Sequence, residues 1–160
     1  MLNFYIGHSL FWNLRSEMYN PNVQQRFGLY LEVFLNKIGP DLRRVFEDEA
    51  WLIERLLAIA DLPHDLNYKK NEFLLKQIYI DELETLNKQF KGREISMPLN
   101  YNMKVKRIVA DKCKIMKSKK KPLWLVFKNA VCIIFTIYLF ILLTYSFLIL
   151  FSRKKQETMY

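Results

Sequence analysis

Hydrophobic side chains recur at helical spacing over the first ninety residues of the chain. One stripe consists of Val23, Phe27, Leu31, Phe34 and Ile38. Its spacing of four, four, three and four residues places all its members on one face of a helix. Asn20-Pro21 supplies a start signal before this stripe, and Gly39-Pro40 supplies a stop signal after it. The pattern therefore predicts an amphipathic helix between the two signals.

Further helices are predicted on both sides of this one. Ser9–Met18 predicts a short helix before it. The next helix is expected to open at Asp41, whose carboxylate can cap it, and to close at Pro63. A last helix is expected over Asn71–Gly92. Its apolar face consists of Leu75, Tyr79, Leu83, Leu86 and Phe90. Short loops between helices of similar length predict antiparallel helical hairpins stacked side by side.

The helical stripes stop after Gly92, where short segments of β-branched and aromatic residues begin. These segments are Val105–Val109, Lys112–Met116 and Leu123–Phe127, preceded by an extended stretch at Ser96–Leu99. They predict the opening strands of a sheet with basic turns. Because one or two hairpins alone are marginally stable in water, we expect this β module to be incomplete. The expected fold class is mainly α, with α-solenoid-type helical hairpins followed by a few strands.

Residues 130–151 form an apolar run that contains no charged side chain. At about 1.5 Å per residue, a helix over this run spans roughly 33 Å, enough to cross a bilayer core. Lys128 and Arg153–Lys155 bracket the run, as is typical of a transmembrane helix. We expect a C-terminal membrane anchor, with the bulk of the chain cytoplasmic and a short basic tail at 152–160. A buried core helix is the alternative.

The positive charge of the chain is concentrated in its middle. The 160 residues carry a formal net charge of +9, and residues 61–130 contain 16 basic and 8 acidic side chains. The basic segment at 104–121 is expected either to attract anionic lipid or to be a solvated strand face. Basic charge also suits nucleic acid, but no nucleic-acid-binding motif accompanies it, so we expect no nucleic-acid partner.

Few residues of the chain could form disulfides or hold a metal ion. Two cysteines, Cys113 and Cys132, exclude a disulfide scaffold, and no Cys/His cluster is present, so we expect no metal site. His8 has no carboxylate or cysteine close to it in the sequence. Cys113 is expected to be a small buried hydrophobic residue, and Trp12 a core residue.

Two stretches of the chain resemble a known enzyme family. The first comprises Ser9-Leu-Phe-Trp-Asn-Leu-Arg-Ser-Glu-Met18, Val23, Arg26-Phe27-Gly28-Leu29 and Leu31-Glu32. The second comprises Met97-Pro98-Leu99-Asn100, Cys113-Lys-Ile-Met116 and Ser118-Lys-Lys-Lys-Pro122-Leu-Trp-Leu125. In order and separation they are similar to phosphatidylinositol 3-kinases, most of all class I, with class II the nearest alternative. The first resembles the end of the helical domain, and the second resembles the opening strands of the kinase small lobe.

The resemblance implies a partial helical domain at 1–92 and a truncated start of the kinase small lobe at 93–129. The family transfers the γ-phosphate of ATP to the 3-hydroxyl of a phosphoinositide with the help of Mg²⁺, and class I relatives bind a regulatory subunit. Its ATP lies under a loop that corresponds here to Met116–Trp124. By position, Met116 and Trp124 would pack against the adenine. Ser118 and Lys120 would reach phosphate oxygens.

The chain departs from the family after Asn129. An apolar run replaces the strand that carries the family's ATP-phosphate lysine, and the 160 residues contain neither the Asp-Arg-His-type catalytic loop nor the metal-binding Asp-Phe-Gly. Because phosphoryl transfer depends on positioning and on charge neutralisation by metal ions, we expect no catalytic residues, an inactive kinase fragment and little binding of ATP.

Two alternatives stay open at this point. One is a tail-anchored membrane module whose helical repeats bind partners, and the other is a basic adaptor of membrane surfaces that is unrelated to kinases. The apolar end is either a real anchor or the product of a gene prediction that reads into non-coding sequence. Without the anchor we expect a cytoplasmic chain that is recruited to membranes.

Overall fold

The computed structural model of the chain describes residues 3–65, 71–98, 100–116, 122–129 and 134–137. Over these residues, four α-helices are followed by a small antiparallel sheet that contains a 3-10 turn. The elements belong to two compact units, which divide the chain between Ala50 and Trp51, within one long helix. Each unit has a hydrophobic core of its own.

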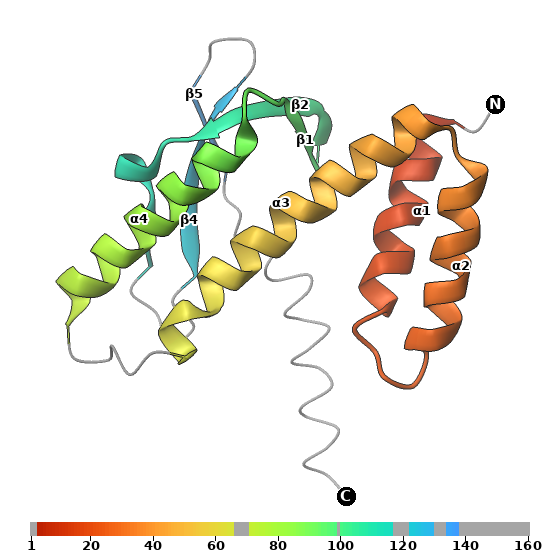
Figure 1. The fold of residues 1–160 in the computed structure, drawn as a ribbon, viewed down its shortest axis with the longest axis horizontal. Helices are drawn as coiled ribbons and strands as arrows, with labels where there is room; N and C mark the ends of the chain where they lie inside the picture. Colours follow the sequence, from red (N-terminus) through yellow and green to blue (C-terminus); the bar gives the residue numbers. More distant parts are fainter. Residues whose placement is uncertain (1–2, 66–70, 99, 117–121, 130–133, 138–160) are drawn as a thin grey trace, which may run out of the picture. The chain divides into compact units, whose positions relative to one another are not determined.

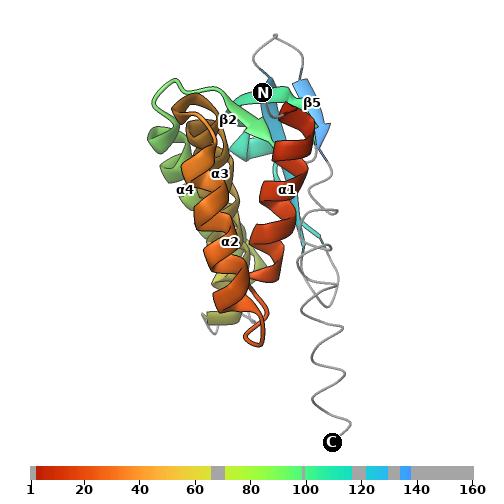
Figure 2. The same cartoon turned by 90° about the vertical axis from the view of Figure 1, so that its right-hand side faces the viewer.

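The first unit contains three helical segments. They are α1 (Phe4–Glu17), α2 (Gln24–Lys37) and the first part of α3 (Pro40–Asp65). Helices α1 and α2 lie side by side as a hairpin in both views (Figure 1 and Figure 2). The sequence predicts these helices in this order, but it misplaces some of their ends.

The ends of α1 and α3 differ from the predicted ends. Helix α1 begins at Phe4 because the side chain of Asn3 accepts a hydrogen bond from the Tyr5 N–H at 3.0 Å and caps it. Helix α3 continues to Asp65 and does not close at Pro63 as predicted. A proline near the end of a helix removes one backbone donor, and here the helix extends two residues beyond it.

Phe46 of α3 is the centre of the core of the first unit. Its side chain has no exposed surface, and its ring stacks on Phe11 of α1 with 4.8 Å between ring centroids. The same ring stacks on Phe34 of α2 at 6.1 Å. One aromatic side chain therefore joins all three helical segments.

Helix α4 (Glu72–Phe90) of the second unit begins and ends close to its predicted bounds. The Asn71 side chain accepts a hydrogen bond from the Leu74 N–H at 3.1 Å and caps the N-terminus. At the other end, Lys91 (φ 49°) and Gly92 (φ 77°) adopt left-handed backbone conformations and reverse the chain. The predicted apolar face is confirmed as the buried face of the helix: Leu75, Tyr79, Leu83, Leu86 and Phe90.

A short turn joins α4 to the sheet. Residues 91–94 alone separate α4 from the first strand. The Arg93 N–H donates to the Phe90 carbonyl at 2.9 Å, and its guanidinium lies 4.7 Å from the centroid of the Trp51 ring. Trp51 also contacts Phe90 edge-to-face, with 6.0 Å between ring centroids. The turn is thus fixed by a hydrogen bond and by aromatic packing.

The sheet is antiparallel and centres on its fourth strand. Its elements are β1 (Ile95–Met97), β2 (Asn100–Ile108), the 3-10 turn η2 (Ala110–Lys112), β3 (Lys114–Ile115), β4 (Leu123–Asn129) and β5 (Ile134–Ile137). Strand β2 pairs with β1 and with the end of β4, while β3 pairs with the start of β4. Strand β5 also pairs with β4. Helix α4 packs against β2 and η2 (Figure 1).

The transmembrane helix predicted at 130–151 is wrong. Residues Ile134–Ile137 within that run form strand β5, which pairs with residues 125–128 of β4. Among the described residues, no helix is long and apolar enough to cross a membrane. β-Branched and aromatic residues such as those of β5 suit a strand, whose backbone groups bond to a neighbouring strand. The rest of the run and the predicted basic tail at 152–160 lie outside the described residues.

The fold is therefore mainly helical with a small antiparallel sheet, and the expected fold class is wrong in its last element.

Replacing Phe90 by alanine is expected to lower the free energy of unfolding by about 3 to 5 kcal/mol, because its ring is 2% exposed in the core. The matched control is Phe73→Ala in the same helix. Its ring is 80% exposed, and the expected change is within about 0.5 kcal/mol. Urea unfolding followed by far-UV circular dichroism measures both. Equal losses in the two variants would contradict this account of the core.

Candidate functional site

Strands β3 and β4 form the hairpin that the resemblance assigns to nucleotide binding. Lys114 lies opposite Trp124 in the ladder between the two strands. Beyond this pair, the Met116 N–H donates to the carbonyl of Pro122 at 2.9 Å. The hairpin is therefore closed between Met116 and Pro122, and residues 117–121 connect its two arms.

Two of the four predicted site residues belong to the described part of this hairpin. Met116 is 38% exposed, whereas Trp124 is partly buried and packs against the core of the second unit. Because Lys114 pairs with Trp124 and side chains alternate along a strand, Met116 and Trp124 lie on the same face of the hairpin. Ser118 and Lys120 lie outside the described residues, so their contacts with phosphate stay a prediction.

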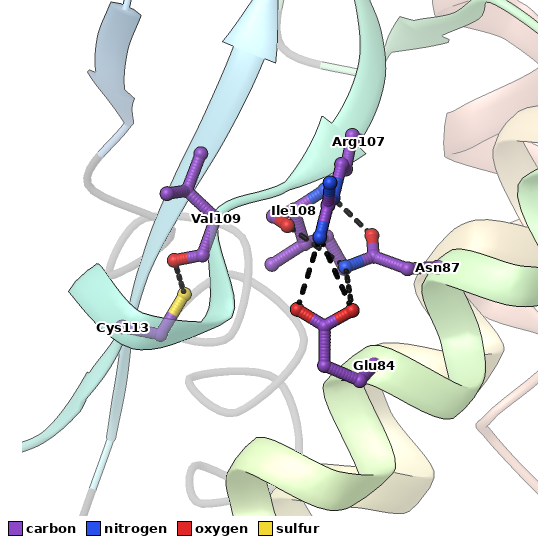
Figure 3. Close-up of polar contacts among 6 residues, drawn as sticks. All are labelled: Glu84, Asn87, Arg107, Ile108, Val109 and Cys113. Carbon is purple, nitrogen blue, oxygen red and sulfur yellow. Dashed lines mark hydrogen bonds and ion pairs between the residues drawn. The ribbon is translucent and has the colours of Figure 1, made fainter.

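The sulfur atom of Cys113 joins the hairpin to the strand that precedes it. The Val109 N–H donates to the Val126 carbonyl at 2.8 Å, which continues the pairing of β2 with β4. Turn η2 then leaves the ladder, and the Val126 N–H donates to Cys113 Sγ at 3.4 Å instead of to a backbone carbonyl. The thiol in turn donates to the Val109 carbonyl at 3.3 Å (Figure 3). Cys113 thus bridges the gap that η2 leaves beside β4.

Cys113 is 8% exposed, which agrees with the prediction of a buried residue. Burial raises the pKa of its thiol above the ordinary value, and the nearby carboxylates of Asp111 and Glu84 act in the same direction. The hydrogen bond from Val126 opposes this shift. The thiol is therefore held protonated at neutral pH, in the form that can donate to Val109.

Helix α4 contacts the end of β2 through one side-chain amide. Asn87 Nδ2 donates to the Ile108 carbonyl at 2.9 Å, and Asn87 Oδ1 accepts from the Ile108 N–H at 2.8 Å. The same Nδ2 donates to Glu84 Oε2 at 3.1 Å, and Arg107 forms an ion pair with Glu84 at 3.3 Å (Figure 3). The amide of Asn87 therefore satisfies both backbone groups of one strand residue.

A second polar cluster lies inside the first unit. Glu49 of α3 has no exposed surface, and its Oε2 lies 2.9 Å from His8 Nε2 and 2.9 Å from Trp12 Nε1, both on α1. The indole N–H donates to the carboxylate. Glu49 Oε1 is buried and has no hydrogen-bond partner among the described residues. The cluster joins α1 to α3 through one buried carboxylate.

Neither the cluster around Asn87 nor the cluster around Glu49 was predicted from the sequence. Glu49 is 41 positions away from His8, so no local pattern joins them. The available signal was an acidic residue near the apolar stripe of α3, which predicts a buried partner. Asn87 gave a similar signal, because it lies four residues after the buried Leu83 and three residues before the buried Phe90. A polar side chain at the margin of a buried stripe needs a hydrogen-bond partner.

Among the residues that the structure describes, no group of three or more His, Cys, Asp or Glu could hold a metal ion.

Comparison with known proteins shows which enzyme family the chain is related to. No protein-family model matches the chain. Phosphatidylinositol 3-kinase 2 of Dictyostelium discoideum is 33% identical over 124 residues, which cover 78% of this chain and 6% of the relative. Phosphatidylinositol 3-kinase 3 of the same organism is 31% identical over 125 residues, which cover 78% of this chain and 7% of the relative. The chain is related to the phosphatidylinositol 3-kinases.

The resemblance read from the sequence motifs is thereby confirmed. The chain spans 6% and 7% of the length of the two curated relatives it matches. It corresponds to a small segment of such a kinase, in which helices precede a sheet and a hairpin.

Replacing Glu49 by alanine is expected to destabilise the first unit, because the donors of His8 and Trp12 would lose their buried acceptor at a cost of about 1 to 3 kcal/mol each. The matched control is Glu47→Ala in the same helix. Glu47 is 55% exposed and pairs with Arg43, so the expected change is about 0.5 kcal/mol. Urea unfolding followed by tryptophan fluorescence measures both, and a loss for Glu49→Ala no larger than that of the control would refute the buried role.

The Cys113 thiol is expected to react slowly with a disulfide reagent at pH 8. Its raised pKa leaves less thiolate at that pH than an ordinary cysteine has, and its burial restricts access. In a Cys132→Ser background, the native chain should react at least about tenfold more slowly than the same chain in urea. The native rate should rise as the pH is raised above 8. Equal rates in native and unfolded chains would show that the thiol is not buried.

Proposed function

We propose that this chain is the segment of a phosphatidylinositol 3-kinase that joins the end of the helical domain to the start of the kinase small lobe. In this proposal, residues 1–92 belong to the helical domain and residues 93–129 to the small lobe. The similarity to two curated kinases and the order of helices followed by an antiparallel sheet support it.

The closed β3–β4 hairpin is the observation that carries the nucleotide part of the proposal. It presents the flexible thioether of Met116 and the indole of Trp124 on one face. A polarizable sulfur and an aromatic ring are suitable surfaces for a planar base such as adenine. Lys114 is exposed and lies opposite Trp124 in the ladder, so it adds a positive charge to the same face of the hairpin. In this proposal Ser118 and Lys120 reach the phosphates.

The activity of the whole kinase would be transfer of the γ-phosphate of ATP to the 3-hydroxyl of a phosphoinositide. There, Mg²⁺ would neutralise the charge on the transferring phosphate. The described residues of this chain do not fit a Mg²⁺ site, because they contain no suitable group of carboxylates. The residues of this chain would therefore position the nucleotide, while the metal ligands, the lipid site and the contacts with a regulatory subunit would belong to the rest of the kinase.

By itself the chain would be inactive. Its 160 residues contain no Asp-Phe-Gly and no Asp-Arg-His sequence, so no residue in it takes the role of metal ligand or catalytic loop. A tail-anchored interaction module is not proposed, because its anchor was the transmembrane helix that the structure contradicts.

The chain is expected to form no phosphorylated lipid when it is incubated with phosphatidylinositol vesicles, Mg²⁺ and ATP labelled in the γ-phosphate. Lipid extraction and chromatography measure the product, and an intact phosphatidylinositol 3-kinase in the same buffer is the positive control. Label above the enzyme-free blank, in lipid phosphorylated at the 3-hydroxyl, would overturn the proposal that the chain is inactive alone.

A further inference from the structure

One strand residue of the second unit has an edge that none of the described strands covers. Strand β1 pairs with β2 as far as Val105, and Ile108 lies beyond the end of that pairing. Ile108 is fully buried, so its N–H and C=O need partners inside the protein. The side chain of Asn87 supplies both partners, at 2.8 Å and 2.9 Å.

An amide side chain is suited to this position because it carries one acceptor and one donor, as a peptide group does. Asn87 therefore takes the place that a residue of a neighbouring strand would fill. Its orientation is fixed from α4, because Glu84 accepts from Nδ2 and excludes the flipped amide. Arg107, the strand residue before Ile108, forms an ion pair with the same carboxylate.

The next residue along the strand bonds in the opposite direction. Val109 donates to Val126 of β4, and its carbonyl accepts from the Cys113 thiol (Figure 3). Ile108 is thus bonded to the helix, while Val109 begins the bonds that lead through Cys113 to the hairpin. A shift of Ile108 along the strand would displace Val109 and Cys113 from the peptide group of Val126.

We propose that Asn87 is a positioning residue, which sets the register of β2 and η2 against β4 and thereby the shape of the β3–β4 hairpin. The nucleotide role of that hairpin rests on the proposed function, but the positioning of Met116 and Trp124 by Asn87 does not. Helix α4 would in this way determine the geometry of the hairpin that β3 and β4 form.

Amide hydrogen exchange of the whole chain, followed by NMR at single residues, tests the proposal. In Asn87→Ala, exchange at the N–H groups of Ile108, Val109 and Met116 is expected to accelerate about tenfold or more, because two buried hydrogen bonds are lost. Exchange at Tyr79, in the middle of α4, is expected to change much less. The indole signal of Trp124 is expected to shift.

Two controls separate positioning from general stability. Gln77→Ala removes the amide that donates to the exposed Asp81 on the same helix, and it should leave the hairpin signals unchanged. Leu75→Ala removes a buried apolar side chain of α4 and should accelerate all slowly exchanging amides of the second unit alike. If Asn87→Ala gives this uniform pattern, or no acceleration at Met116, the positioning role is wrong.

A second substitution keeps the test valid if Asn87→Ala does not fold. Asn87→Asp retains an acceptor for the Ile108 N–H but at neutral pH has no donor for the Ile108 carbonyl, and its charge faces Glu84. Exchange at Met116 is expected to accelerate in this variant too, with a smaller change at the N–H of Ile108. Unchanged exchange at Met116 would overturn the proposal.

Addition of millimolar ATP to the unsubstituted chain separates this inference from the proposed function. Shifts of the Met116 and Trp124 signals would support the nucleotide role of the hairpin. If ATP shifts neither signal, the nucleotide role fails, and the exchange pattern of the Asn87 variants still decides whether Asn87 positions the hairpin.

Discussion

The pairing of β4 with strands from three parts of the chain is the constraint on which the second unit depends. Strands β2, β3 and β5 all bond to it, and β1 and η2 are attached through β2. Four consecutive members of its core segment are buried or partly buried, from Leu123 through Trp124 and Leu125 to Val126. A strand bonded along both edges and buried on both faces has no freedom to shift its register without exposing apolar surface. The candidate hairpin takes its position from this strand.

The local secondary structure of this chain could be predicted from its sequence, because interactions between neighbouring residues determine it. The stripe of α4 and its two boundary signals at Asn71 and Gly92 follow from side-chain spacing, a capping oxygen and the left-handed preference of glycine. The start of β4 at Leu123 followed from its β-branched and aromatic composition. Each of these features requires only residues that are close together in the sequence.

Features that depend on residues far apart in the sequence could not be predicted in the same way. A continuous apolar run such as 130–151 satisfies the pattern of a buried strand as well as that of a membrane helix, and its length favoured the wrong choice. The pairing of Ile134–Ile137 with β4 shows that this part of the run is a strand. Among the predicted site residues, Met116 and Trp124 were assigned through the family resemblance, and their role in nucleotide binding stays a prediction. The partners of Asn87 and Glu49 could not be found, because they lie 21 and 41 positions away.

The turn between α4 and β1 has a mechanical consequence. Only residues 91–94 link the two elements. The Arg93 N–H donates to the carbonyl of the last helical residue, and its guanidinium lies over the Trp51 ring. Hinge motion needs a few residues that can change their backbone angles without unpacking a core. Here Phe90 lies in the core directly beside that turn, so a hinge at this point would have to expose it. We therefore expect helix α4 and the sheet to move together, so that a displacement of the helix also displaces the strands.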